Sequence, residues 1–441
     1  MLFTTFPFGA SALARCWIYR QVLSMRKAAT PWLALVLLLS AGMPANATYF
    51  NFPVNPPPAC SRNNADYTCS ALTLNTGDTL TVAPMLVVNV TVNGDFTVNA
   101  EVEINKNGSA SNLNFRVIGV TTTGSKAVVN ANIASFGTDS VINIGPGNKV
   151  VGNLETKDAA INVGDGTTIQ GALTTTNTGV ITVGKNATVS GGLTTFTGAI
   201  NVGAYSTTGA LISTSAGAVT TGDFSVVNGK IATGAGAVTT GADSKVLGSV
   251  TTAVGAITTG ARSTVSGKIN NLDTSTAGAV TVGAAGVVNG PIVTGAGAVT
   301  VGAGGKVDGS IVTGAGAVTV GANAVAGGVS TQDGAITVGV DSYMKGSLCT
   351  GNSGAITVGA RSKVDGNVIT QTAGAITVEA NANVVGIAKV EKAGALSVAA
   401  SATVGTVKSS IQCPDVSVPP PGGPAGPPVI KSREWRQLFM R

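Results

Sequence analysis

Residue types that carry catalysis are scarce in this chain. It has no histidine, and only 20 aspartates and glutamates among 441 residues. Two of them, Asp308 and Asp365, fall at the same place in repeats three units apart, and glycosidases use paired carboxylates. At the spacing of ~4.8 Å between neighbouring strands they would lie about 14 Å apart, too far for that chemistry. The sequence therefore predicts a protein that is not an enzyme and disfavours a polysaccharide hydrolase or lyase.

Sites for metals, nucleotides and nucleic acids are not indicated either. The chain has no Cys-x-x-Cys pair, so a zinc site of the usual cysteine and histidine type is excluded. The glycine-rich nonapeptide that binds calcium is absent, and Gly295-Ala296-Gly297 opens no helix that could receive a phosphate. Without its first 47 residues, the chain holds 22 basic and 20 acidic residues, which is no electrostatic footprint for nucleic acid. We expect no cofactor.

Four of the five cysteines follow residue 47. Cys60 and Cys69 are nine residues apart and would close a small loop, so we expect a disulfide between them in an oxidising compartment. Cys349 and Cys413 could pair if the C-terminal segment folds back along the molecule, or could remain free thiols. The spacing of these two cysteines does not decide between a disulfide and free thiols.

Threonines recur at fixed intervals and could form hydroxyl ladders. One series, with Asn at some earlier positions, is expected to face outward in register and includes Thr300, Thr319, Thr337, Thr357 and Thr377. A second outward ladder would run through Thr156, Thr233, Thr294, Thr313, Thr331, Thr350 and Thr370. Flat threonine arrays on some β-solenoids bind ice, whereas threonine ladders also stack well simply because threonine suits strands.

The elements that position these ladders are repeats. The motif Gly-Ala-Val/Ile-Thr-Val/Thr-Gly recurs every 18 to 20 residues between Gly179 and Gly394. One longer step, from Gly255 to Gly278, carries an insertion at Asn271-Leu272-Asp273-Thr274. Such a unit cannot bury its apolar face alone, but stacked copies form a continuous core.

Within one repeat the side chains alternate as in strands. Val299, Val301, Val307 and Ile311 share one parity and would face inward, with glycines at the corners to adopt positive φ. We therefore predict an all-β fold, a single elongated β-solenoid of about 14 regular coils of ~19 residues plus degenerate N-terminal coils. At ~4.8 Å per coil the rod would be on the order of 80 Å long.

The N-terminus has the layout of an export signal. Met25-Arg26-Lys27 precedes an apolar run from Ala34 to Ala41, and Ala45-Asn46-Ala47 suits cleavage. We expect residues 25–47 to be removed near Ala47 and the protein to be exported to the periplasm, the cell surface or beyond. Residues 1–24 are an upstream extension or precede the true start. No later run is apolar enough for a transmembrane helix.

The remaining chain divides by composition. We assign 48–85 to an N-terminal cap, 86–412 to the solenoid, 413–430 to a Pro/Gly linker and 431–441 to a basic, aromatic tail. The tail would present one apolar helical face, which favours a docking element. Its candidate residues are Arg433, Trp435, Arg436, Leu438, Phe439 and Arg441.

The repeat, read as GAITVGA followed by alternating Val, Gly and Ile, resembles the coils of bacterial polymer-forming β-helices of the bactofilin type. It is also similar to repeats of exported, adhesin-like surface proteins. The resemblance spans about residues 86–408 and implies a structural role without catalytic residues. We expect an exported structural rod that contacts a surface or matrix component. The alternatives are a self-associating polymer-forming β-helix and an ice-binding threonine solenoid.

Overall fold

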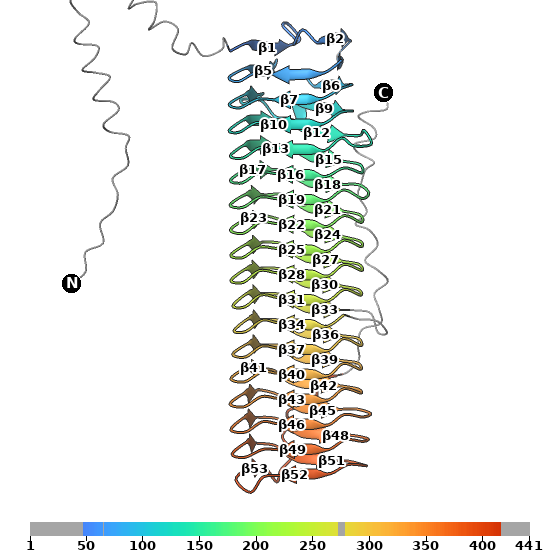
Figure 1. Ribbon diagram of the computed structural model, residues 1–441. Helices are drawn as coiled ribbons and strands as arrows, with labels where there is room; N and C mark the ends of the chain where they lie inside the picture. The colour runs from blue at the N-terminus through green and yellow to red at the C-terminus, as the bar shows by residue number, and fades with distance from the viewer. Residues whose placement is uncertain (1–46, 65, 272–277, 416–441) are drawn as a thin grey trace, which may run out of the picture. The chain divides into compact units, whose positions relative to one another are not determined.

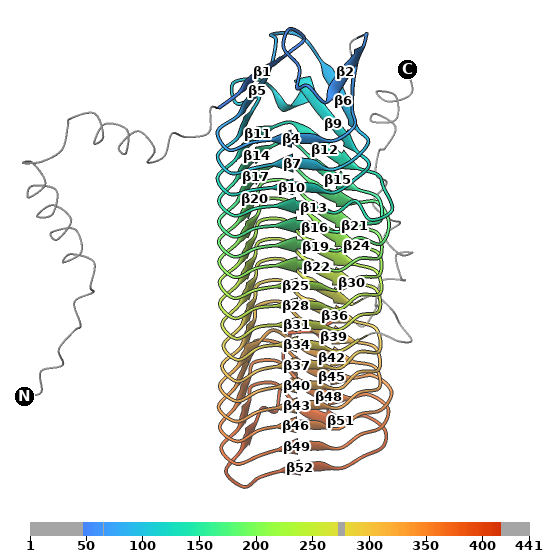
Figure 2. The same ribbon diagram turned by 45° about the horizontal axis from the view of Figure 1, so that its top comes forward.

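The computed structural model describes residues 47–64, 66–271 and 278–415. The described chain forms a parallel β-solenoid of about 17 turns, with three sheets of 18, 18 and 17 strands. The predicted fold class is confirmed, with a few more turns than the regular repeats indicate. Figures 1 and 2 show the coils stacked one below the next, with each sheet on a separate face of the stack.

One regular coil shows the arrangement of the strands. It contains β36 (Ile292–Thr294), β37 (Val299–Val301) and β38 (Lys306–Val307), and β39 (Ile311–Thr313) begins the next coil. Each strand pairs in parallel with its counterpart one coil on, as Ile292 does with Ile311. The four inward residues predicted here, Val299, Val301, Val307 and Ile311, are all fully buried. Burying one such side chain contributes roughly 1.5–3 kcal/mol, so a column of them forms a continuous core.

The second threonine series faces the interior, so the expectation of a second outward ladder is wrong. Thr294 and Thr313 are fully buried. Each donates its hydroxyl to a glycine carbonyl three residues on, Thr294 to Gly297 at 2.7 Å and Thr313 to Gly316 at 3.1 Å. In a three-residue strand the first and third residues share a face, so threonine lies inward and bonds the backbone of the corner that follows.

Most corner glycines are not required for a positive φ, which is the reason that the sequence suggested. Of the corner glycines in this coil, only Gly304 has a positive φ, of 66°, and later coils place Asn323, Asp341 and Arg361 there instead. At Gly316, a corner position that is glycine in successive repeats, an added Cβ would lie 2.1 Å from the carbonyl oxygen of Gly297 in the preceding coil. Close approach of successive backbones is therefore what requires glycine at this corner.

The N-terminal end of the stack is covered. β1 (Tyr49–Phe52) pairs in parallel with β5 (Thr79–Val82), and β2 (Cys60–Asn63) forms an antiparallel hairpin with β3 (Asp66–Cys69). Phe52 and Tyr67 are buried with ring centroids 4.3 Å apart. Residues 48–85 therefore both close this end and contribute strands to the sheets, and the degenerate coils follow with β6 (Val88–Val92) and β9 (Leu113–Val117).

Several predicted segments lie outside the described residues: the leader up to residue 46, most of the insertion after Asn271, most of the 413–430 linker and the whole 431–441 tail. Within the part that is described, the only helical element is a 3-10 turn at Ala110–Asn112. No helix there is long and apolar enough to cross a membrane.

The inner threonine ladder makes a direct prediction about stability. Thr313→Val removes the hydroxyl that accepts from the Gly316 amide and donates to its carbonyl, and should cost about 1–3 kcal/mol because the buried amide loses its partner, whereas the carbonyl keeps the Thr331 hydroxyl. The matched change Thr300→Val, at an exposed position of the same type of strand, should stay within about 0.5 kcal/mol. Urea unfolding midpoints measure both, and equal effects would contradict the assignment.

Candidate functional surfaces of the solenoid

The first threonine series forms a surface column along one sheet. Thr300, Thr319 and Thr337 are exposed, whereas Thr357 and Thr377 are half-buried. Each lies directly opposite the next in the strand pairing, so neighbouring hydroxyls follow the interstrand spacing of ~4.8 Å. Earlier coils continue the column with threonine and, at some positions, asparagine, and the side-chain amide of Asn162 donates to Asn143 at 2.9 Å.

The residues that flank this column are small and uncharged. Ala298 is exposed before Thr300, and Gly302 follows the strand. The face therefore offers a single row of hydrogen-bonding groups on a flat, neutral surface. Such a surface can contact another flat, repetitive surface, and the threonines of this column, with Ala298 and Gly302 beside them, carry no charge.

Charged residues gather on another sheet, near the C-terminal end. The Asp308 carboxylate lies 2.8 Å from the Lys306 ammonium and 2.9 Å from that of Lys345. Hydrogen bonds from these two lysines lower the pKa of Asp308. An ionised carboxylate with two lysine partners cannot act as a general acid at neutral pH.

Asp365 belongs to a separate group. It lies 2.8 Å from the Lys363 ammonium and accepts a hydrogen bond from Tyr343, whose ring lies 5.2 Å from that ammonium. The two aspartates considered for carboxylate chemistry thus have different partners. Among the described residues, no group of three or more cysteine, aspartate or glutamate side chains is placed to hold a metal ion.

An exposed aromatic pair was not predicted from the sequence. Tyr205 and Phe224 occupy equivalent corner positions in successive coils, with ring centroids 4.9 Å apart and ring planes within 6° of parallel. Their spacing of 19 residues, equal to the repeat, was the available signal. Both side chains remain largely exposed, at 59% and 47%, and form a small apolar patch on the surface of the rod.

The C-terminal segment 405–415, which we call the strap, folds back along the outside of the stack. A disulfide joins Cys413 to Cys349, which lies in β45 (Leu348–Thr350), and another joins Cys60 to Cys69. The Asn367 side chain donates to the carbonyls of Ser409 and Ile411 at 3.0 and 3.2 Å. The Ser347 hydroxyl also donates to Ile411, at 2.7 Å.

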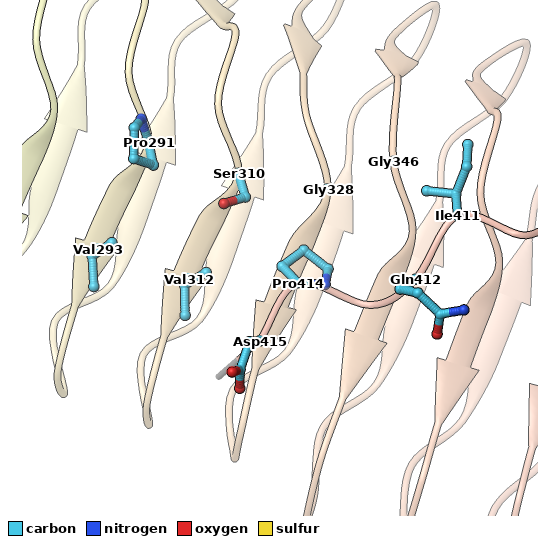
Figure 3. A pocket seen from close by; sticks show the side chains of 10 residues that line it. All are labelled: Pro291, Val293, Ser310, Val312, Gly328, Gly346, Ile411, Gln412, Pro414 and Asp415. Atoms are coloured by element: carbon cyan, nitrogen blue, oxygen red, sulfur yellow. The ribbon is translucent and has the colours of Figure 1, made fainter. Parts of the chain in front are cut away.

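The coils beneath the strap have a surface that is complementary to it. A side chain at Gly328 would lie 2.7 Å from the Pro414 ring, so only glycine leaves room for the strap there. Val312 and Ile369, at outward positions, are only 5% exposed. A shallow groove continues beyond the strap, lined by Val293, Val312 and Ser310 and by Pro414 and Asp415 of the strap itself, as Figure 3 shows.

The strap disulfide should stabilise the last coils. It closes a span of 64 residues, for which loop entropy predicts about 4 kcal/mol, compared with about 3 kcal/mol for the nine-residue span of Cys60 and Cys69. The double variant Cys349→Ser, Cys413→Ser should speed amide hydrogen exchange in residues 356–404 and leave the N-terminal coils unchanged.

The matched control is Cys60→Ser, Cys69→Ser, which should show the opposite pattern. Unchanged exchange near the C-terminus without the strap disulfide would mean that the hydrogen bonds of Ser347 and Asn367 alone hold the strap.

Comparison with known proteins finds no matching family model, no similar curated protein and no similar solved structure. The function of these surfaces is therefore argued from their geometry.

Proposed function

We propose that this protein is an exported structural rod that acts, without catalysis, at the cell surface or in the extracellular matrix. The observation that carries the proposal is the unbroken in-register stack of about 17 turns, from β1 to β53 (Thr403–Val404). At ~4.8 Å per turn the stack is about 80 Å long. Such a rod extends far from its point of attachment, and its repetitive face allows many weak contacts to add up to strong binding.

Export is supported by cysteine chemistry as well as by the leader. All four cysteines after residue 47 are in disulfides, Cys60 with Cys69 and Cys349 with Cys413. Disulfides of this kind persist in oxidising compartments and are rare in a reducing cytoplasm. The basic, aromatic tail 431–441 would attach the rod to a surface or matrix component.

The polymer-forming alternative, which the resemblance to bactofilin-type coils suggested, has less support. A filament of rods needs an open edge at each end. The N-terminal end is closed by Phe52, Tyr67 and an antiparallel hairpin, which differs from the parallel pairing that continues a stack. Discrete rods therefore fit the described residues better than filaments.

Export can be tested by producing the full chain with an epitope after Arg441. We expect the protein outside the cytoplasm, with an N-terminus at Thr48 and no thiol that reacts before reduction. Deletion of Ala34–Ala41 should retain it in the cytoplasm with residue 47 still attached to its leader. An unprocessed wild-type chain with free thiols in the cytoplasm would refute the export proposal.

A second candidate function is ice binding, favoured by the exposed, in-register hydroxyl column on a flat, neutral face. If it holds, Thr300→Tyr with Thr319→Tyr should abolish inhibition of ice recrystallisation, because two bulky rings would break the flat surface. The control pair Lys306→Tyr with Val325→Tyr places the same rings on another sheet of the same two coils and should keep the activity. Wild-type protein without activity, or equal loss in both pairs, would remove this candidate.

A further inference from the structure

The last coil of the solenoid is open. β52 (Leu396–Val398) pairs with β49 (Ile376–Val378) on one side only. Leu396 and Val398 are 48% and 41% exposed, whereas their counterparts one coil earlier, Ile376 and Val378, are 0% and 1% exposed. Core side chains and unpaired strand edges at one surface are a template for another chain.

The described chain does not cover this end. β51 (Ala388–Val390), β52 and β53 form the end of the stack opposite β1 (Figure 1). From Gly405 the strap turns away along the flank, contacts Asn367 and Ser347 in succession, and brings Pro414 beside Gly328. The disulfide of Cys413 with Cys349 fixes this course. The described residues thus leave this end accessible to a second molecule.

We propose that two copies of this chain join tail to tail through their last coils, related by a two-fold axis perpendicular to the rods. An axis through the centre of β52 places Ser397 opposite Ser397 of the second copy. It also places Leu396 opposite Val398, and Val390 opposite Val404, so that the inward positions of both last coils meet apolar partners. The strands then pair antiparallel, which satisfies the amides and carbonyls left unpaired at each end.

This contact is self-complementary and closes on itself. An isologous interface uses the open end of both molecules and leaves no further one, because the N-terminal ends are covered. One coil of roughly 20 residues a side is in the range of stable interfaces. The product is a pair of rods about 160 Å long with both N-terminal ends outward and both straps near the middle.

The proposed pairing depends only on the rod shape of the protein, and it requires no partner bound by the tail or by the threonine column. Purified full chain should therefore show twice the chain mass by sedimentation equilibrium at micromolar concentration. Leu396→Lys with Val398→Lys should weaken the pairing at least 100-fold. Both residues are already half-exposed, so the variant should keep the circular dichroism of the wild type.

Cross-linking tests the geometry. Ser397→Cys should form a disulfide between two copies under mild oxidation. Thr377→Cys, in the same surface column one coil earlier, should not, because its mate would be about 14 Å away, beyond the reach of a disulfide.

Three results would overturn the proposal. One is a monomer at all concentrations without a Ser397→Cys cross-link. Another is a monomer in which the amides of residues 396–398 are protected from exchange until residues 416–441 are removed, which would make the chain's own C-terminus the cover. The third is a long filament, which would require contacts at the N-terminal end.

Discussion

The whole molecule depends on parallel backbone pairing between each coil and the next. Three short strands per coil must lie directly over their counterparts, as β36 lies over β39, or the amides and carbonyls of the coil lose their partners. Strands of two or three residues tolerate no slip, because a shift by one residue would turn every core side chain outward. The spacing of 18 to 20 residues between motifs is the sequence expression of this constraint.

The same constraint makes each position along the coil a column of like residues, each ~4.8 Å from the next. Columns of valine and isoleucine make the core, and the inner threonines bond the corners. On the surface, residues about one repeat apart in the sequence come into contact, as the stacked rings of Tyr205 and Phe224 do. It also produces the bidentate ion pair of Arg262 with Asp243, whose hydrogen bonds lower the pKa of that carboxyl.

What could be predicted from the sequence follows from this periodicity. Alternation around Val299 and Val301 and the repeated glycines were sufficient to predict the solenoid and the inward residues. The same alternation places Thr313 inward, because it lies two residues after Ile311 in one strand. What it could not predict is the hydrogen bond of the Thr313 hydroxyl to the corner at Gly316, which depends on the path of the turn. The fold-back of the C-terminal segment was one of two alternatives that Cys349 and Cys413 left open, and the disulfide between them decides for it. The place where this segment binds was not predictable, since Gly328 and Asn367 resemble ordinary corner residues.

Functional specificity in such a protein must come from departures from the repeat, because the regular coils present nearly the same surface many times. Two of these departures lie at the ends of the stack. At the N-terminal end, bulky rings and a hairpin stop the stack, whereas the described residues leave the core of the last coil exposed. The strap explains how the last coil can remain exposed although the chain continues beyond it into a C-terminal tail. Because it leads the chain to the flank and is tied there by Cys349, attachment through the tail and contact through the last coil use different parts of the rod.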